Sequence, residues 1–268
     1  MKTKILLSLL IMALHLPLLA QTKATNLSGS IAGTWKMTSQ TAKDPKGQSF
    51  TTDLTKNTQY KIITPTHWMY VGYNSDSLKG GGDGGVYTLK GNKYIETLDG
   101  AKTDFTVKVA GDKYYQDGFI IYPDGEKLEL HEIYQRVPEP KGKNADIAGT
   151  WNFVSGNDLS NGKKTPEKDM QELMIITPQH LMWVHKTIAG KFKEALVASY
   201  TREGNTITPN GIIASWPLGK EKVKVTATVK GDQMFSHVTV TMPDGKKEEF
   251  EAIHQNVSKP KLAKTASK

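Results

Sequence analysis

The feature that most constrains the fold is a long internal repeat. Short strings from the first half of the chain recur, in the same order, in the second half. The matched pairs are SIAGTWKM (30–37) with DIAGTWNF (146–153), YTLKGNKY (87–94) with YTREGNTI (200–207), VAGDKYY (109–115) with VKGDQMF (229–235), YPDGEK (122–127) with MPDGKK (242–247), and EIYQRV (132–137) with AIHQNV (252–257). The period is longer than a solenoid unit and matches a small domain, so the sequence predicts two tandem copies of one domain.

Composition marks the edges of the two copies. The segment 138–146, PEPKGKNAD, is rich in proline and lysine, as is common for a linker between domains. We therefore expect a first domain at 21–137, a second domain at 147–257 and a basic disordered tail at 258–268.

Residues 1–20 have the pattern of a secretory signal peptide. Lys2 and Lys4 precede an apolar run at 5–14, and Ala20 supplies a small residue for cleavage. The run is too short to predict a transmembrane segment. The chain has no cysteine, which argues against disulfides, thiolate metal sites and a lipoprotein anchor. The sequence thus predicts a periplasmic or secreted bacterial protein.

The positive charge of the chain does not point to a nucleic-acid partner. The formal net charge is +8, but Lys2, Lys4 and the four lysines of 258–268 account for six of these charges. The other basic residues are interspersed with acidic ones, and no nucleic-acid-binding motif accompanies them. We expect no nucleic-acid partner.

Within each copy the pattern is one of short strands and tight turns. The segment GFIIYPDGEKLELHEIYQRV (118–137) reads as a hairpin with Pro-Asp-Gly at its turn. Further hairpins with Gly-Asn or Gly-Asp turns are expected in KGNKYIETL (90–98), DFTVKVAGDKYY (104–115) and KVKVTATVKGDQMFSHVTV (222–240). No stretch keeps a convincing helical period. About eight to ten strands in a domain of this size indicate an all-β fold, either a closed antiparallel barrel or a sandwich.

Both copies open with Gly-Thr-Trp, at 33–35 and 149–151. This motif resembles the Gly-x-Trp signature of the lipocalin and fatty-acid-binding superfamily. The copy length, the hairpins and the leader are similar to those of small lipocalin-like domains in secreted Bacteroidetes proteins. The resemblance implies two tandem up-and-down β-barrels that hold a small, mostly apolar ligand. It also implies that Trp35 and Trp151 each close one end of a barrel, with Arg136 packed over the Trp35 ring.

The two copies can be compared position by position, because side chains alternate between the two faces of a strand. Along the last strand one face is nearly unchanged: Lys127, Glu129, His131, Ile133, Gln135 and Val137 against Lys247, Glu249, Glu251, Ile253, Gln255 and Val257. Every position of the other face differs: Leu128, Leu130, Glu132, Tyr134 and Arg136 against Glu248, Phe250, Ala252, His254 and Asn256. We expect the changed face to point into the barrel and the kept face to meet solvent or the other domain.

The changed face supplies candidate ligand-binding residues. Tyr134 and Arg136 resemble, in reverse order, the inward Arg and Tyr that hold carboxylates in fatty-acid-binding barrels, and a guanidinium suits a carboxylate or phosphate group. The alternative is that Glu132 neutralises Arg136 inside the barrel. Aromatic residues can line a pocket or simply fill the core. The full candidate ligand-binding set is Glu132, Tyr134, Arg136, His254, Trp68, Tyr70 and Trp183.

A second motif, Ile-Ile-Thr-Pro-x-His, occurs at 62–67 and 175–180. The strand face that each histidine starts is the same in both copies, with His, Met and Val at alternate positions, whereas the opposite face differs. We therefore interpret His67 and His180 as structural residues at a turn, bonded to its backbone. The glycine-rich run at 79–87 lacks the Lys-Ser/Thr of a phosphate loop, and we expect a mobile hairpin loop there.

Together these observations favour an exported protein that holds a lipophilic or amphipathic ligand, carboxylate-bearing ligands included, in one or both barrels. We expect no cofactor and no metal site, because the histidines lack metal-ligand spacing. Two alternatives stay open. One is an enzyme on the same barrel, a cyclase, isomerase or lyase with a pocket His or Glu as its acid–base group. The other is an envelope protein that binds or inhibits a protein partner.

Overall fold

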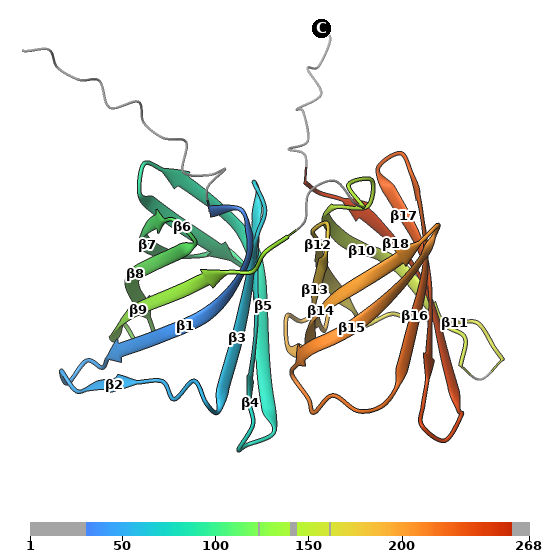
Figure 1. Ribbon diagram of the computed structural model, residues 1–268, viewed down its shortest axis with the longest axis horizontal. Helices are drawn as coiled ribbons and strands as arrows, with labels where there is room; N and C mark the ends of the chain where they lie inside the picture. The colour runs from blue at the N-terminus through green and yellow to red at the C-terminus, as the bar shows by residue number, and fades with distance from the viewer. Residues whose placement is uncertain (1–30, 123, 140–143, 161, 259–268) are drawn as a thin grey trace, which may run out of the picture.

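The computed structural model describes residues 31–122, 124–139, 144–160 and 162–258. The predicted signal peptide at 1–20, and the predicted tail beyond residue 258, lie outside the described residues. The described chain folds into two closed antiparallel barrels of eight strands each, which lie side by side (Figure 1). The prediction of an all-β fold of two tandem up-and-down barrels is confirmed.

Barrel 1 is a meander of eight strands that carries one short additional strand. Its strands are β1 (Gly33–Lys43), β2 (Ser49–Thr51), β3 (Asn57–Ile63), β4 (His67–Asn74), β5 (Lys79–Lys90), β6 (Lys93–Leu98), β7 (Ala101–Ala110), β8 (Lys113–Ile121) and β9 (Lys127–Arg136). In this meander β1 pairs with β3, and each later strand pairs with the next. Pairing of β1 with β9, from Trp35↔Arg136 to Lys43↔Glu129, closes the barrel. The short β2 pairs only with the end of β1.

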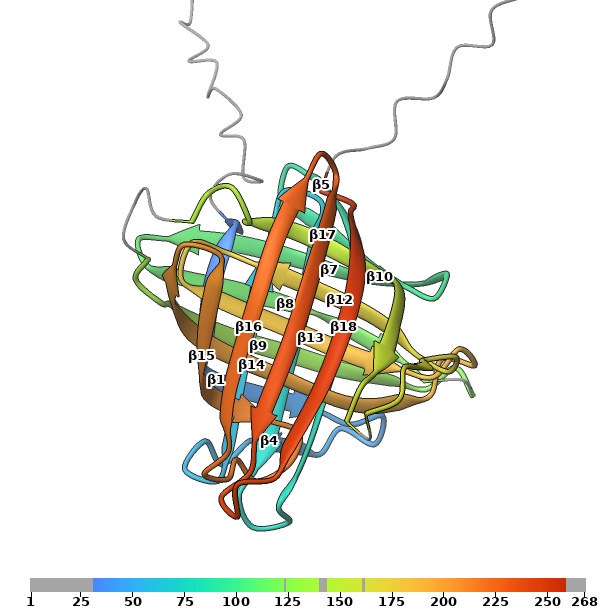
Figure 2. The ribbon, with the colours of Figure 1, turned by 90° about the vertical axis from the view of Figure 1, so that its right-hand side faces the viewer.

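Barrel 2 repeats this topology. Its strands are β10 (Gly149–Asp158), β11 (Thr165–Pro166), β12 (Gln171–Ile176), β13 (His180–Lys186), β14 (Phe192–Glu203), β15 (Thr206–Ala214), β16 (Lys222–Lys230), β17 (Gln233–Thr241) and β18 (Lys247–Asn256). Pairing of β10 with β18 closes it, and β16, β17 and β18 form the wall farthest from barrel 1 (Figures 1 and 2). Even the irregularity in the first strand recurs, between Met37 and Ser39 and between Phe153 and Ser155.

The Gly-Thr-Trp motif builds one end of each barrel. The indole N–H of Trp35 donates to the Ile31 carbonyl at 2.8 Å, and that of Trp151 donates to the Ile147 carbonyl at 3.0 Å. Both rings are buried. In barrel 1 the Arg136 guanidinium carbon lies 4.0 Å from the centroid of the Trp35 ring, the stacking that the family resemblance implies. This end of each barrel is called the closed end below.

The two barrels share an apolar interface. Tyr60, Ile62, Met69 and Val71 of barrel 1 form one buried cluster with Ile175, Met182, Val184, Ala195 and Val197 of barrel 2. The matching Met and Val positions of the two copies therefore face each other, and their kept identity reflects this contact. The apolar surface that each barrel presents here is removed from water by the other barrel.

The glycine-rich run at 79–87 is not a mobile loop: it is the first part of β5, and β5 lies against barrel 2 (Figure 1). The expectation is wrong because glycine within a strand can mark the close approach of another backbone as well as a turn. A Cβ on Gly82 would lie 2.8 Å from the Cβ of Ala195, and one on Gly80 would lie 2.7 Å from the Cα of Ser215. Glycine is needed there because the barrels pack so closely.

Both paired histidines have structural contacts. Thr64 and Thr177 accept hydrogen bonds, through their hydroxyls, from the backbone N–H of His67 and His180, at 3.0 Å each. The His67 ring bonds the Thr66 hydroxyl at 2.8 Å, so the ring contacts a side chain of the turn rather than its backbone. Burial lowers the pKa of His67.

The linker residue Glu139 joins the two barrels at this turn. Its Oε1 accepts hydrogen bonds from the hydroxyls of Thr34 (2.5 Å) and Thr177 (2.8 Å) and contacts Nδ1 of His180 (3.1 Å). Burial acts to raise the pKa of Glu139, but the hydrogen bonds from His180 and the two threonines outweigh it and lower the pKa. Thr34 belongs to barrel 1 and the other two to barrel 2, so this carboxylate fixes the linker to both.

Candidate functional site

The last strand of each barrel turns its changed face inward. Leu130, Glu132 and Tyr134 of β9 are buried, and so is His254 of β18, while His131 on the opposite face is exposed. The comparison of the two copies therefore identified the interior face of this strand. The polar groups inside the two barrels differ.

Barrel 1 encloses an ion pair that was not predicted. Lys61, only 3% exposed, donates to the Glu96 carboxylate at 2.5 Å and to the Gln116 side-chain oxygen at 2.8 Å. The hydroxyl of Tyr114 donates to the same Gln116 oxygen at 2.6 Å. The Lys61 ammonium also lies 5.3 Å from the centroid of the Trp68 ring, within cation–π range. This charged cluster fills the centre of the barrel.

Glu132 and Tyr134 form a second network beside it. Glu132 accepts from the Gln40 amide at 2.9 Å and from the Tyr134 hydroxyl at 3.0 Å, and Tyr134 accepts from the Gln59 amide at 2.8 Å. Burial raises the pKa of Glu132, although the nearby Lys61 acts in the opposite direction. Glu132 therefore takes its partners from Gln40 and Tyr134 rather than from Arg136.

Arg136 lies apart from these groups, at the closed end. It donates to the Ala32 carbonyl at 2.8 Å in addition to covering Trp35. Gly33 has a φ of 136°, and a Cβ on this residue would lie 2.6 Å from Nη1 of Arg136. The glycine of the Gly-x-Trp motif thus makes room for the guanidinium, and the internal pairing of Arg136 with Glu132 considered from the sequence is replaced by these contacts.

The remaining predicted aromatic residues divide between the barrels. Trp68 is buried in barrel 1, where its indole N–H donates to the Val86 carbonyl at 3.2 Å and its ring stacks with that of Tyr70. Trp183, at the position of Tyr70 in the second copy, lines barrel 2 and stacks on His185 with ring centroids 4.1 Å apart.

A small hollow lies at the end of barrel 1 away from Trp35. Its volume is about 200 Å³, and Gln40, Gln59, Gly72 and Gly81 are among the residues that line it. A Cβ on Gly81 would meet open space. Pockets for drug-sized ligands usually occupy about 300–1,000 Å³, so this hollow suits nothing larger than a very small molecule.

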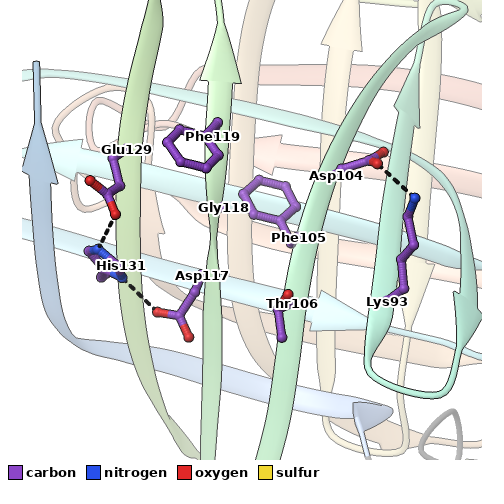
Figure 3. A pocket seen from close by; sticks show the side chains of 9 residues that line it. All are labelled: Lys93, Asp104, Phe105, Thr106, Asp117, Gly118, Phe119, Glu129 and His131. Carbon is purple, nitrogen blue, oxygen red and sulfur yellow. Dashed lines mark hydrogen bonds and ion pairs between the residues drawn. The ribbon is translucent and has the colours of Figure 1, made fainter. Parts of the chain in front are cut away.

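A larger hollow of about 420 Å³ lies on the outer surface of barrel 1, over β7, β8 and β9 (Figure 3). Its charged side chains pair with one another: His131 bonds Asp117 at 2.8 Å and Glu129 at 3.3 Å, and Lys93 bonds Asp104 at 3.0 Å. These groups are about half exposed, and the hydrogen bond to Asp117 raises the pKa of His131. Mutual pairing in water leaves this surface with little to offer a ligand.

The interior of barrel 2 holds a chain of alternating histidine and glutamate side chains. His254 Nε2 bonds Glu172 Oε1 at 2.7 Å, the other Glu172 oxygen bonds His185 Nε2, and His185 Nδ1 bonds Glu194 at 3.0 Å. The strand registers place Gln59, Gly72 and Gly81 of barrel 1 at the positions of Glu172, His185 and Glu194. The hollow of barrel 1 thus lies where barrel 2 has the side chains of His185 and Glu194.

Charge alternates along the chain. Burial acts to raise the pKa of Glu172, but the charges and hydrogen bonds of His254 and His185 outweigh it and hold the pKa well below its usual range. Burial acts to lower the pKa of His185, but Glu172 and Glu194 outweigh it and raise that pKa to about 9. His185 is therefore a cation between two carboxylates at neutral pH.

His254 is the exception in this network. Its Nδ1 is buried and has no hydrogen-bond partner among the residues that the structure describes. The ring meets Phe153 edge-on, with centroids 6.1 Å apart, and Phe153 stacks with Phe250 at 6.5 Å. His254 thus presents one unpaired polar atom to an aromatic environment.

The aromatic side chains around His254 are less enclosed than their counterparts. Met37 and Leu130 belong to the core of barrel 1, which Leu54 also covers from the segment after β2. Phe153 and Phe250, at the matching positions, keep part of their surface accessible and lie outside the core cluster of barrel 2. The end of each barrel opposite its closed end is called the open end, and at the open end of barrel 2 part of the apolar surface is not packed.

The wall of barrel 2 is also weaker on one side. β15 and β16 pair at only two positions, Thr206↔Thr226 and Ile207↔Val225, whereas β6 and β7 pair at six. The segment 215–221 connects the separated strand ends and places Trp216 against Trp183, with ring centroids 5.9 Å apart. A gap closed by a loop rather than by a backbone ladder is easier to open.

Comparisons with known proteins give only distant structural matches. The sequence matches no protein-family model and no curated protein. Among solved structures, it is similar to a DUF3598-family protein of unknown function from Nostoc punctiforme, with a TM-score of 0.30, 11% identity, and coverage of 85% of this chain and 96% of that one. Transferrin binding protein B from Neisseria meningitidis gives a TM-score of 0.26 at 8% identity, covering 81% of this chain and 43% of that one. Similarity of this degree carries no argument about function.

Two further observations complete the site. Within the described ranges, no group of three or more His, Cys, Asp or Glu side chains is placed to hold a metal ion. The same part of the chain contains no helix long and apolar enough to cross a membrane.

Proposed function

We propose that this is an exported binding protein whose second barrel holds a small, largely apolar ligand, while the first barrel serves as a scaffold. The observation that carries the proposal is His254 Nδ1, a buried polar atom that lies near aromatic side chains and has no hydrogen-bond partner within the described part of the chain. A buried polar atom left without a hydrogen bond costs about 1–3 kcal/mol. A ligand that supplies its partner recovers that free energy, which is how a few polar atoms orient a ligand in an apolar site.

The contrast between the two barrels supports this assignment. In barrel 1 the charged groups Lys61, Glu96 and Glu132 have partners within the barrel, and Leu54 covers the open end. In barrel 2 the accessible surfaces of Phe153 and Phe250 adjoin the unpaired nitrogen of His254. The buried hydroxyl of Tyr94, in barrel 1, also has no hydrogen-bond partner among the described residues, but it lies within the packed core, whereas Nδ1 of His254 adjoins accessible aromatic surface.

Export is part of the proposal and rests on the leader at residues 1–20. The absence of cysteine suits a periplasmic or secreted bacterial protein that does not depend on disulfides.

The test uses the neutral fluorescent probe N-phenyl-1-naphthylamine and the full mature chain. We expect saturable binding of one probe molecule per chain, weakened by Trp183→Ala because the probe loses an aromatic wall. The matched control is Tyr70→Ala, at the same position of barrel 1, which should leave probe affinity unchanged. Thermal melts check that both variants are folded. Weakening by the Tyr70 variant alone, or no saturable binding at all, would refute the proposal.

An acid–base enzyme is a second candidate, favoured by one observation. Glu172 bonds Nε2 of His254 and leaves Nδ1 facing the aromatic side chains, the arrangement of a histidine base oriented by a carboxylate. The discriminating measurement is NMR of a bound ligand in D₂O. Exchange of its carbon-bound hydrogens that disappears in His254→Leu would indicate catalysis, and binding without exchange would indicate a carrier.

A further inference from the structure

The wall of barrel 2 opens at Pro209. Alternate residues of an antiparallel strand direct their backbone groups to the same neighbouring strand. The carbonyl of Asn205 accepts a hydrogen bond from the N–H of Ala227 on β16, and Ile207 pairs with the same strand. Two residues farther along, Pro209 directs its backbone toward β16 as well. Proline has no N–H to donate, so the ladder between β15 and β16 stops before it.

Barrel 1 continues its ladder at the same place. When the copies are aligned through YTLKGNKY and YTREGNTI, Glu96 corresponds to Pro209, and Glu96 pairs with Thr103 of β7. Residues 99–100 alone separate β6 from β7, whereas the longer segment 215–221 separates β15 from β16. The proline and the longer segment therefore distinguish barrel 2, the barrel proposed to bind a ligand, from barrel 1.

The segment 215–221 is fixed at its first residue. The Ser215 carbonyl accepts a hydrogen bond from the N–H of Gly80 in barrel 1 at 3.0 Å, and the Ser215 N–H donates to the Ala195 carbonyl at 2.9 Å. Within the part of the chain that the structure describes, no backbone hydrogen bond joins residues 216–221 to either barrel. A segment with one fixed end and few backbone hydrogen bonds opens at a low cost in free energy.

Two apolar side chains of this segment lie on the barrel. Leu218 lies over Gly211 of β15, where a Cβ on the glycine would be 3.0 Å from Cδ1 of Leu218. Trp216 lies against Trp183, with ring centroids 5.9 Å apart, and Trp183 stacks in turn on His185 of the interior network. Displacement of Trp216 therefore uncovers Trp183, the aromatic residue next to that network.

We propose that ligands enter barrel 2 between β15 and β16, beneath the segment 215–221, which acts as a lid that Trp216 holds closed. Trp216 leaves Trp183 to admit the ligand and returns to close the wall over it. This inference rests on the proposed binding function. The competing route is the open end beside Phe153 and Phe250, and a covalent staple on the lid separates the two routes.

The staple is a disulfide between the lid and β15, made in the double variant Gly211→Cys/Leu218→Cys. The chain has no cysteine, so this pair can form only one disulfide. A Cβ on Gly211 would lie 3.7 Å from Cγ of Leu218, close to where a cysteine sulfur at position 218 would lie, so the disulfide needs only a small adjustment. Stopped-flow fluorescence measures the binding of N-phenyl-1-naphthylamine to the full mature chain, oxidised and reduced.

Oxidation of this variant should slow probe association at least roughly tenfold relative to its reduced form. Dissociation should slow by a similar factor, because the probe leaves by the same route, and the equilibrium affinity should therefore stay within about twofold. The matched control is Thr97→Cys/Lys102→Cys, a staple between directly opposite residues of β6 and β7 in barrel 1, which should leave both rates unchanged.

Trp216→Ala provides a second arm that needs no disulfide and decides the question if the staple does not form. Without the contact on Trp183 the lid opens more often, so probe association and dissociation should both become faster. A faster dissociation alone would contradict the inference, since it would make Trp216 a wall of the site and not part of its entrance. The control Phe235→Ala, on the outer face of β17, should change neither rate.

The outcomes separate this inference from the proposed function. Equal association rates in the oxidised and reduced forms, with the disulfide verified by mass spectrometry, would overturn the lid and place entry at the open end, and binding itself would stand. No saturable binding of the probe to the unmodified protein would overturn both.

Discussion

Lys61→Met removes the cation at the centre of barrel 1 and replaces it with the residue that the second copy has at this position, Met174. The Lys61 ammonium lies 2.5 Å from the Glu96 carboxylate, and the two side chains are only 3% and 10% exposed. Removing one partner of such a pair leaves a buried charge uncompensated, which typically costs about 3–5 kcal/mol. The Gln116 side-chain oxygen loses its hydrogen bond from Lys61 but keeps the one from the Tyr114 hydroxyl, so this loss adds little to the free-energy cost.

The double variant Lys61→Met/Glu96→Leu separates lost charge from lost packing. Replacing both members of a buried ion pair by apolar residues is often neutral or stabilising. We therefore expect the double variant to recover most of the loss, to within about 1 kcal/mol of the unmodified protein. The control Lys36→Met changes a neighbouring exposed lysine, and should stay within about 0.5 kcal/mol.

Urea unfolding measures the free energies, and hydrogen exchange locates the effect. Peptides from β3, β6 and β8 should lose protection in Lys61→Met, while the matching strands of barrel 2 serve as an internal reference. A cost below about 1 kcal/mol for the single variant, or an equal cost for the double, would show that the pair is not the dominant electrostatic contact of this barrel.

The remaining predictions concern pH, the interface and the closed end. Because Glu172 and Glu194 raise the pKa of His185 from 6.5 to about 9 against the effect of burial, its stabilising contribution is complete below pH 6.5 and lost as pH rises to about 9. In His185→Gln, urea unfolding at several pH values should show this alkaline loss, at most about 3 kcal/mol, disappear; an unchanged pH slope argues against a charged His185. Gly82→Ala should push the barrels apart and raise the radius of gyration in X-ray scattering, whereas Gly81→Ala, whose Cβ meets open space, should not; equal effects would contradict the close packing. Arg136→Leu should cost about 1–2 kcal/mol in the same unfolding assay, and no loss would mean that its contact with the Trp35 ring is not stabilising.

Much of the architecture could be predicted from the sequence because the chain contains two copies of one domain. The repeat gave the two copies, the turn residues gave hairpins, and the Gly-Thr-Trp motif gave the closed ends. Comparison of the copies along the last strand also placed Tyr134 and His254 on the interior face. These features depend on local patterns and on alternation, which a single chain displays openly.

The interior networks were harder to predict, since they depend on side chains from strands far apart in sequence. Lys61 and Glu96 are 35 residues apart, and Glu172 and His254 are 82 apart. One signal was present in the sequence. When the two copies are aligned, Lys61 corresponds to Met174, and Gln59 corresponds to Glu172. A charge in one copy and not in the other, on an inward face, marks such sites.

Glycine carried two meanings that the sequence does not distinguish. Gly125 and Gly245 adopt φ values of 86° and 87° in the Pro-Asp-Gly turns, as their context predicted. Gly82 has no such torsion and is needed because Ala195 of the other barrel approaches its backbone. Only the packing of one domain on another separates these cases.

The shared interface has a consequence for how the chain can be divided. Met69 and Val71 meet Met182 and Val184, the same positions of the two copies, in one apolar cluster. Like surfaces that meet each other are the pattern of a two-fold homodimer. The protein is in this sense a dimer made from a single gene product, held by a covalent linker. Either half produced alone would expose this strip to water and should pair with itself, so the natural unit for expression, crystallisation or engineering is the whole tandem.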